Sequence, residues 1–196
     1  MPDSSTLTTF TSAALRKPGT VGAIAPSSPR LARRMADVVP GQGHPTVVEL
    51  GPGTGAVTRV IAAALAGRGT QLALEVDRDM VTHLRRVFPH VQSHHADAAE
   101  LAEILLTSGL GKVDAVVSGL PWTLFSSERQ RSMLGAIAAA LVPGGVFTTF
   151  TYRHSLAIPS ARRFRELLED TFAEVSQTRT IWANLPPAIT YVCRTA

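Results

Sequence analysis

The sequence predicts an α/β fold in which a mostly parallel sheet carries helices on both faces. Three observations support this prediction. Short apolar runs alternate along the chain with segments of helical periodicity. A glycine-rich turn at residues 51–55 joins the first apolar run to a helical segment, as in the strand–turn–helix unit of open sheets. The chain ends on two expected strands with no helix between them, which makes one strand antiparallel.

The expected elements follow in order from their turn and capping residues. Ser28 caps a helix whose first residue is Pro29, and this helix ends near residue 39. Strands are expected over 47–50, 72–76, 91–95, 113–118, 146–152, 174–182 and 189–194. Helices are expected over 56–67, 78–88, 98–106, 127–141 and 159–172, with 143–145 closing the fourth of them. Residues 1–15 carry a weak apolar stripe that fits a surface helix or a tail.

Length and composition fit one globular unit. With 196 residues, 45% hydrophobic and 17% charged, the chain can bury a substantial core. We expect residues 1–39 to form an N-terminal helical segment over the mouth of the site and residues 40–196 to form a single domain. The longest strictly apolar run, 136–142, is far too short to span a membrane, and no signal peptide is expected. Cys193 is the one cysteine, which suits a reducing cytoplasm.

The most informative stretch is V-V-E-L-G-P-G-T-G, over residues 47–55. A buried strand ends there, three glycines follow, and an apolar helical run begins at Ala56. Glycines suit such a turn because a Cβ would intrude on a ligand that lies against the backbone. A glycine-rich turn without a ligand is one alternative. The G-x-G-x-x-A pattern of nicotinamide-cofactor proteins, formed by Gly51, Gly53 and Ala56, is another.

Three further features favour a different cofactor. Glu49 stands two residues before the first glycine, Gly55 adds a third glycine, and Glu75 ends the next strand roughly 20 residues later. The pattern E-x-G-x-G-x-G resembles motif I of class I S-adenosylmethionine-dependent methyltransferases. This resemblance implies a Rossmann-like seven-stranded sheet in the order 3-2-1-4-5-7-6, with one antiparallel strand.

The same resemblance implies which residues contact S-adenosylmethionine. The glycine turn would pack against the methionine part, Glu75 would take the ribose hydroxyls, and Asp97 would accept the adenine amino group with Ala98 beside it. The full set of expected cofactor contacts is Pro26, Ser27, Ser28, Glu49, Gly51, Pro52, Gly53, Thr54, Gly55, Glu75, Val76, Asp97, Ala98, Ser118 and Gly119.

The loop after the fourth expected strand, Ser118-Gly119-Leu120-Pro121-Trp122, bears on the substrate. Amine methyltransferases carry [N/D]-[P/L/I]-P-[Y/F] near this point, and Ser118 departs from that motif. The form S-G-L-P resembles bacterial phosphatidylethanolamine N-methyltransferases, a group similar to rRNA adenine dimethylases. The segment P-G-T-V-G-A-I-A-P-S-S-P at 18–29 resembles the same group. We expect Leu120, Pro121 and Trp122 to contact the substrate and Gly119 to let the backbone approach it.

Three residues at the end of the fifth expected strand complete the expected site. Tyr152 or His154 would orient or deprotonate an acceptor amine, and Arg153 would hold a phosphate. The indole rings of Trp122 and Trp182 are more typical of a core than of a site. A metal site built from His90, His94, His95, Asp97 and Glu100 is an alternative that we do not favour, because alternate strand residues face opposite sides. No metal is therefore expected.

Charge is concentrated at the N-terminal end. Arg16, Lys17, Arg30, Arg33 and Arg34 oppose only Asp3 in the first 36 residues, so that segment alone carries the net charge of +4 of the whole chain. A solvated basic face is one explanation. The other is an anionic partner such as a membrane surface, RNA or a phosphorylated substrate.

The leading hypothesis is N-methylation of a phospholipid head-group amine by a cytoplasmic enzyme, peripheral on the inner face of the membrane. A soluble small-molecule methyltransferase is the first alternative. An rRNA adenine dimethyltransferase is disfavoured because no helical domain follows the last expected strand, so nucleic acid is not expected as a partner. A cofactor-binding module without methyl transfer is the non-enzyme alternative. No obligate protein partner is evident.

Overall fold

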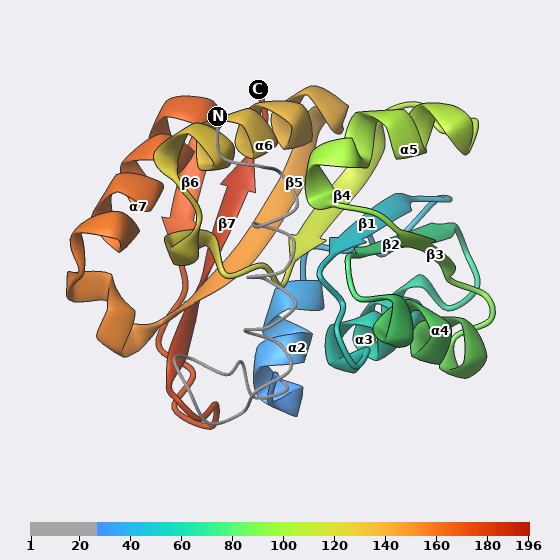
Figure 1. Cartoon of the computed structure of the whole chain (residues 1–196), viewed down its shortest axis with the longest axis horizontal. Coiled ribbons are helices and arrows are strands. Elements are labelled where there is room, and N and C mark those ends of the chain that lie inside the picture. The colour runs from blue at the N-terminus through green and yellow to red at the C-terminus, as the bar shows by residue number, and fades with distance from the viewer. Residues whose placement is uncertain (1–26) are drawn as a thin grey trace.

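The computed structural model describes residues 27–196, which form a seven-stranded sheet in the order β3-β2-β1-β4-β5-β7-β6 (Figure 1). Neighbouring strands pair in parallel except that β7 runs antiparallel to both β5 and β6. The predicted order and the single antiparallel strand are therefore confirmed. The strands are β1 (Thr46–Leu50), β2 (Thr70–Glu75), β3 (Gln92–His95), β4 (Val113–Ser118), β5 (Leu141–Tyr152), β6 (Glu174–Gln177) and β7 (Ala188–Arg194).

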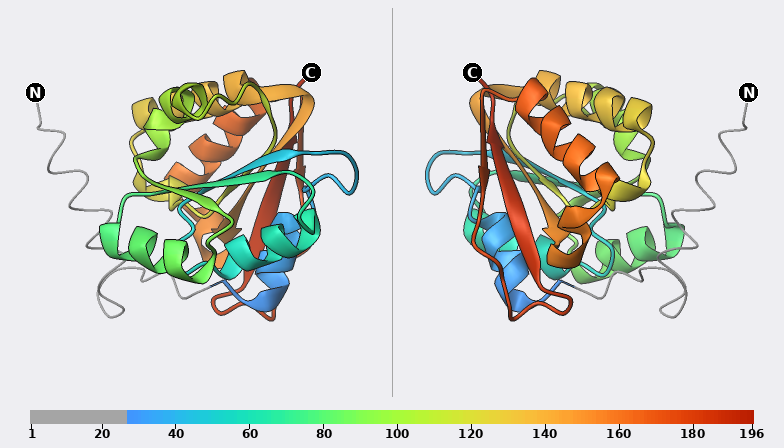
Figure 2. Two further views of the ribbon diagram at one scale, coloured as in Figure 1. Left: turned by 90° about the vertical axis from the view of Figure 1, so that its right-hand side faces the viewer. Right: turned by 90° about the vertical axis from the view of Figure 1, so that its left-hand side faces the viewer.

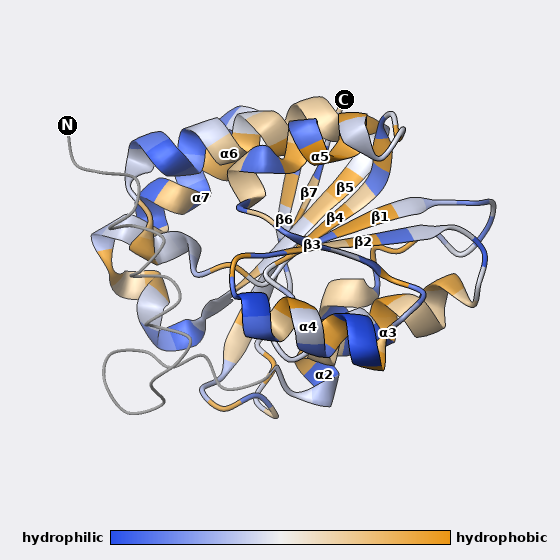
Figure 3. Cartoon of the chain, turned by 45° about the vertical axis from the view of Figure 1, so that its right-hand side comes forward, coloured by the Kyte–Doolittle hydropathy of each residue, from blue (hydrophilic) through white to orange (hydrophobic). Residues whose placement is uncertain are grey.

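Helices cover both faces of this sheet. One face carries α2 (Pro29–Ala36), α3 (Ala56–Leu65) and α4 (Arg78–Val87), and the other carries α5 (Leu101–Thr107), α6 (Ser127–Ala140) and α7 (Pro159–Thr171). Edge-on views show the sheet between the two layers (Figure 2). The strands are predominantly hydrophobic, as burial of a sheet on both faces requires, while hydrophilic residues gather on helices such as α4 and α6 (Figure 3).

Three apolar clusters of described residues hold these layers together, and the smallest packs Leu84 and Phe88 against the sheet. Against α6 and α7 the sheet buries a large cluster that includes Met133, Ile137 and Phe164. Against α2 and α3 it buries a smaller cluster that includes Leu31 and Ile61. Helix α2 therefore belongs to the packed domain. Its predicted start is confirmed, since the Ser28 hydroxyl accepts the Leu31 N–H at 3.2 Å.

The element boundaries differ from the expected ones at two places in the second half of the chain. Strand β5 begins at Leu141, so residues 143–145 lie inside a strand and do not only close a helix. Hydrogen bonds from Thr195 to the carbonyls of Val142 and Gly145 extend the pairing there. Strand β6 ends at Gln177, because beyond it the Thr178 hydroxyl, rather than a carbonyl, accepts the Thr190 N–H.

The helices differ from their predicted bounds by smaller amounts. Helix α2 ends at Ala36 and not near residue 39. The expected helix over 98–106 is a 3₁₀ turn, η1 (Ala98–Glu100), followed by α5. Two further 3₁₀ turns, η2 (Trp122–Leu124) and η3 (Arg153–Ala157), follow β4 and β5.

The carboxyl ends of the parallel strands meet at one edge of the sheet. The Gly51 N–H donates to the Leu74 carbonyl at 2.9 Å, and the Gly119 N–H donates to the Leu50 carbonyl at 2.8 Å. The antiparallel strand β7 begins at this edge, since Ala188 pairs with Tyr152. Loops that follow β1, β2, β4 and β5 and the loop that precedes β7 are thus brought together, which is where open α/β sheets bind ligands.

Candidate active site

The three glycines of the turn after β1 serve three different purposes. All have positive φ angles, +70° at Gly51, +54° at Gly53 and +87° at Gly55. A Cβ on Gly55 would lie 2.4 Å from the Phe88 ring, so this glycine is required by packing against α4. A Cβ on Gly53 would meet nothing within 4 Å. Of the three, Gly53 is therefore the one that faces open space and can lie against a ligand.

Gly51 and Gly119 form the closest approach between the two loops of the site. A Cβ on Gly119 would lie 2.7 Å from the Gly51 carbonyl oxygen, and a Cβ on Gly51 would lie 2.8 Å from a Leu120 methyl carbon. The absence of a side chain at residue 119 thus lets the β4 loop approach the glycine turn. That Gly119 also lets the backbone approach a substrate stays a prediction. The contact sets the β4 loop directly beside the turn.

Glu75 is the buried acid that organises the glycine turn. Its two carboxylate oxygens accept the backbone N–H groups of Gly53 and Asp77, each at 3.0 Å. Burial raises the pKa of this carboxyl, and the two backbone donors oppose that rise. Glu75 therefore fixes the conformation of Gly53, and the lone pairs that remain on its oxygens are the acceptors available to ligand hydroxyls.

Glu49 lies on β1 below the turn and is 2% exposed. Burial raises the pKa of its carboxyl to about 8, and the negative charge of Glu75 adds to the rise, while Thr58 and Gln71 favour the ionised form. Its Oε2 atom is buried and has no hydrogen-bond partner among the described residues. An acid in this state keeps its proton at neutral pH unless a positive charge is bound nearby.

Asp97, in the loop after β3, makes two side-chain interactions. Its carboxylate caps η1 by accepting the Ala99 N–H at 2.9 Å, and it forms an ion pair with Arg129 of α6 at 2.5 Å. Ala98 beside it is buried. The predicted adenine acceptor is thus held in place from two sides. The contact of Arg129 with Asp97 could not be predicted from the sequence, because 32 residues separate the two and no local pattern links them.

The histidines near β3 do not assemble into a metal site in the described part of the chain. No group of three or more potential metal ligands is found there. The ring of His95 bonds to the Val76 carbonyl at 3.0 Å. Burial lowers the pKa of His94, and the neighbouring Arg85 lowers it further.

Ser118 and Trp122 give the β4 loop its shape. The Ser118 hydroxyl, which is fully buried, accepts the Trp122 indole N–H at 3.0 Å. The indole stacks on Phe164 with a centroid separation of 5.1 Å and is 1% exposed. Trp122 is therefore a core residue, as its type suggested, and it reaches the pocket beside it only as part of the wall.

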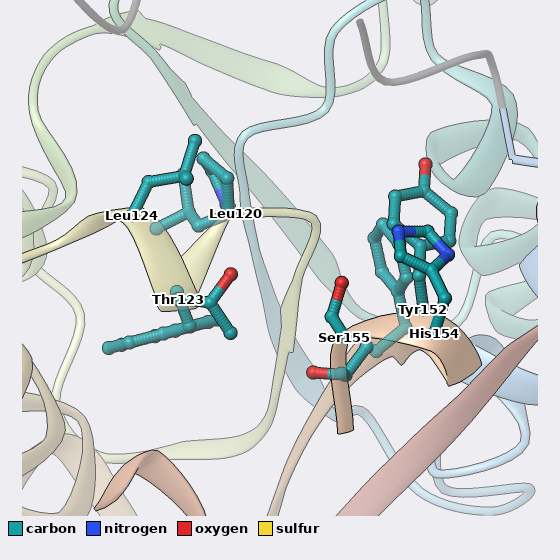
Figure 4. Close-up of a pocket in the computed structure, with 10 residues that line it drawn as sticks. Leu120, Thr123, Leu124, Tyr152, His154 and Ser155 are labelled. Atoms are coloured by element: carbon teal, nitrogen blue, oxygen red, sulfur yellow. The ribbon is translucent and has the colours of Figure 1, made fainter. Parts of the chain in front are cut away.

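A pocket lies between the loops that follow β4 and β5. Leu120 and Leu124 stand on one side of it, and Tyr152, His154 and Ser155 stand on the other (Figure 4). The Tyr152 and His154 rings are stacked, with centroids 5.7 Å apart and planes 9° apart. Burial raises the pKa of the Tyr152 phenol, which keeps it neutral at physiological pH. Pro121 also lines the pocket. The wall is thus mostly apolar. The side chains of Tyr152, His154 and Ser155 lie together on one side, and the Thr123 hydroxyl lies on the other.

Arg153 and Trp182 do not occupy their expected places. The Arg153 guanidinium donates to the Thr180 hydroxyl at 3.1 Å and lies 5.2 Å from the centre of the Trp182 ring, so it points toward the loop before β7 and does not line the pocket. Trp182 is 69% exposed, and the prediction that it belongs to the core is wrong. Its loop projects beyond the sheet, and no apolar layer formed by residues 27–196 covers it.

The remaining predicted cofactor contacts lie in two places: Pro52 and Thr54 within the turn, and Ser27 and Ser28 at the start of α2. Pro52 is buried and Thr54 is exposed, and the Pro52 carbonyl accepts the Gly55 N–H. The Ser28 backbone N–H donates to the side-chain oxygen of Asn184 at 3.0 Å. Asn184 could not be predicted from the sequence, because 156 positions separate it from Ser28. Ser27 is half-buried next to it. Pro26 lies outside the described residues, as do the expected stripe over 1–15 and most of the segment at 18–29.

Comparison with known proteins agrees with this geometry. A family model described as a methyltransferase domain matches residues 47–145. An ornithine lipid N-methyltransferase of Singulisphaera acidiphila is 37% identical over 177 residues, which cover 89% of this chain and 88% of that protein. The chain belongs to the methyltransferase family. It is a class I enzyme that uses S-adenosylmethionine, as the E-x-G-x-G-x-G motif and the sheet order predict.

Two other proteins similar to this methyltransferase are more distant or are matched over a shorter stretch. A ribosomal RNA small subunit methyltransferase A of Burkholderia multivorans is 33% identical over 95 residues, 47% of this chain and 34% of that protein. The structure of a precorrin-6y C5,15-methyltransferase of Geobacter metallireducens has a TM-score of 0.63 at 16% identity and covers 85% of this chain and 88% of that one. That likeness concerns the fold alone.

The residues of the methyltransferase fit its cofactor. Gly53 leaves open space at the turn, and the buried carboxyls of Glu49 and Glu75 lie beneath and beside it, where a cationic ligand favours their ionised forms. The cofactor supplies a methyl group that its sulfonium already activates. The protein's task is to bind, orient and exclude water.

The raised pKa of Glu49 predicts a pH-dependent stability. The folded state holds a proton on Glu49 between pH 4.5 and about 8, where the unfolded state has lost it, so the free energy of unfolding falls as pH rises through that window. Glu49→Gln keeps the shape but has no titratable proton. We expect the stability of Glu49→Gln relative to the wild type to increase with pH, by at most about 1.4 kcal/mol per pH unit.

Urea unfolding of both proteins across this pH window measures the effect. Glu103→Gln, on the exposed face of α5, is the control, and parallel profiles for Glu49→Gln and wild type would contradict the assignment.

The open space at Gly53 predicts a selective loss of cofactor binding. Valine at this position would place its side chain where the ligand lies and should weaken binding of S-adenosylhomocysteine more than about tenfold, or ~1.4 kcal/mol. Gly144 has a similar φ of +72° and also faces open space, so Gly144→Val shares the backbone strain without touching the site. Titration calorimetry compares the two. Equal affinities for the two folded variants would show that Gly53 does not face the cofactor.

Proposed function

We propose that this methyltransferase N-methylates the amine of a lipid head group. The observation that carries the proposal is the 37% identity to the ornithine lipid N-methyltransferase, which extends over 88% of that protein. The pocket supports it. Its walls include Leu120, Leu124 and Phe150, which suit the apolar part of an amphipathic substrate, and its polar end carries Tyr152 and His154.

The chemistry requires a neutral amine beside the methyl donor. An alkyl ammonium has no lone pair, and its pKa of about 10 keeps it protonated in water. An apolar pocket lowers this pKa because it disfavours the charged form. The nitrogen lone pair then forms the new N–C bond while the C–S bond breaks, and its electron pair stays on the sulfur. The surplus proton must leave the nitrogen for a base or for water.

Tyr152 and His154 divide these tasks. The Tyr152 hydroxyl, kept neutral by burial, orients the amine as a hydrogen-bond partner and is a poor proton acceptor. The stacked His154 ring is exposed and lines the same pocket, so it can pass a proton to solvent. The carbonyls of Gly119 and Leu120 are the backbone groups that we propose to hold the amine. The Leu120 carbonyl accepts the Trp122 N–H and keeps a second lone pair.

A role on ribosomal RNA is the second candidate. The 33% identity to the ribosomal RNA methyltransferase favours it, but that match spans only 34% of the relative. A soluble small-molecule amine is the other enzymatic alternative, and the apolar pocket admits it. Transfer of a labelled methyl group separates the three substrate classes.

The expected location also remains part of this proposal. Among the described residues, no helix combines the length and apolarity that crossing a bilayer requires. We infer a cytoplasmic enzyme that works at the inner membrane surface, with residues 1–35 taking part in the approach. Of the basic residues in that segment, Arg30, Arg33 and Arg34 lie on α2, and the others lie outside the described residues.

Incubation with methyl-labelled S-adenosylmethionine tests the substrate class. Separate pools of ornithine lipid, phosphatidylethanolamine, ribosomal RNA and soluble amines are offered, and label transfer is measured after extraction. We expect transfer to an amine lipid and none to RNA. Label found in RNA or in soluble amines, with none in the lipid fraction, would overturn the proposal.

The structure predicts that Tyr152→Phe lowers kcat with little change in cofactor affinity. The ring and its stacking remain while the orienting hydroxyl is lost. We expect a fall on the order of ten- to a hundredfold, below the 10²–10⁴-fold typical of a lost general base. Tyr191→Phe, in the core between β7 and α7, is the control. Unaltered turnover of Tyr152→Phe would remove Tyr152 from the mechanism.

A further inference from the structure

The loop between β6 and β7 exposes two large apolar side chains. Trp182 is 69% exposed and Leu185 is 83% exposed, within four residues of each other. Single exposed apolar residues are common on protein surfaces. These two, however, stand on a loop that projects from the carboxyl edge of the sheet, because β7 begins opposite the end of β5. They therefore lie at the edge where the active-site loops meet.

A basic groove adjoins these apolar side chains. Arg30, Arg33 and Arg34 of α2 line it from one side, and Arg179 and Trp182 line it from the other. The acidic residue in its wall is Asp37, which pairs with Arg34 at 3.3 Å. In the described part of the chain, four arginines and one aspartate line the groove and leave it positive, so its chemistry suits several phosphate groups at once.

Buried contacts make α2 and this loop one surface. The buried Asn184 accepts the Ser28 N–H at the start of α2 and donates to the Pro186 carbonyl at 2.7 Å. Ile181 packs into the same core cluster as α2. Figure 1 shows the loop and α2 side by side at one end of the molecule. The arginines and the exposed apolar side chains thus keep a fixed relation to each other.

Arg153 joins this surface to the active-site pocket. It directly follows Tyr152, donates its backbone N–H to the Pro187 carbonyl at 2.8 Å, and lays its guanidinium against Trp182. Leu124, at the pocket itself, is also 63% exposed. The basic groove, the apolar loop and the pocket mouth are therefore consecutive along one side of the molecule.

We propose that this side docks on an anionic lipid bilayer, with Trp182 and Leu185 entering the boundary between head groups and acyl chains and the arginines contacting lipid phosphates. Docking of this kind presents the pocket to head groups at the surface. The proposal rests on the proposed function, because it supplies the lipid to that same pocket. A bilayer fits better than RNA, since Leu185 cannot stack on a base and gains only by leaving water.

Vesicle co-sedimentation of the full chain tests the proposal. Vesicles of phosphatidylcholine alone are compared with vesicles that also contain phosphatidylglycerol, at low and high salt. We expect binding to the anionic vesicles that salt weakens. Trp182→Ala/Leu185→Ala should lower the partition coefficient about tenfold or more. Each of Arg30→Gln and Arg33→Gln should lower it on the order of fivefold.

Matched controls come from the opposite edge of the sheet. Leu106 is 79% exposed near the end of α5, and Arg86 is exposed near the end of α4. Leu106→Ala and Arg86→Gln should bind anionic vesicles as the wild type does. Equal losses in the control and docking variants, or wild-type binding by the docking variants, would overturn the proposal. Loss of RNA binding by the docking variants, with vesicle binding unchanged, would overturn it as well.

Activity in neutral detergent micelles separates this proposal from the proposed function. There the amine lipid reaches the pocket without a charged bilayer, so the docking variants should methylate it within about twofold of the wild type while losing activity on anionic vesicles. Loss of activity in both settings would contradict the docking role. A wild type that binds anionic vesicles but methylates no amine lipid in either setting would refute the proposed function and leave the docking surface standing.

Discussion

The close approach of Gly119 to the Gly51 carbonyl is the constraint on which the site depends. It brings the loop after β4 against the turn after β1, at the point where the strand order of the sheet reverses. A side chain at residue 119 would force these loops apart. We propose that the first loop binds the cofactor and that the pocket beside the second takes the substrate. In that case this backbone contact holds the two sites next to each other.

Two buried acids then determine the form and the electrostatic environment of the turn. Glu75 holds the Gly53 N–H, and Glu49 lies beneath with an unpartnered oxygen. Burying carboxyl groups without a cation is unfavourable, as their raised pKa values record. The folded protein thus retains an electrostatic cost that a positively charged ligand relieves. The buried acids favour a bound cation, whereas the apolar pocket beside the turn disfavours positive charge and so favours the neutral form of an acceptor amine.

Much of this arrangement could be predicted from the sequence. Periodicity and turn residues gave most element positions, and the motif resemblance gave the strand order. These succeeded because hydrophobic alternation and glycine turns are local properties. Contacts between distant segments could not be predicted. The Asp97–Arg129 ion pair, the Asn184 link to Ser28 and the extension of β5 by pairing with Thr195 all depend on residues that no local pattern connects.

Exposure was likewise hard to predict. Trp182 was assigned to the core from its residue type, yet it stands on a projecting loop beneath Arg153. Arg153 was assigned to a phosphate near the pocket from its position after Tyr152, yet the guanidinium turns to the neighbouring loop. In both cases the orientation follows from β7 running antiparallel, which places its loop beside the end of β5.

A crystal structure of the methyltransferase with S-adenosylhomocysteine tests the central claim most directly. We predict that the cofactor sulfur lies at the junction of the glycine turn and Leu120 and faces the pocket that Tyr152 lines. We also predict that the Gly51–Gly119 contact persists in the complex. A sulfur atom that faces away from this pocket, or a cofactor bound outside the turn, would contradict the account.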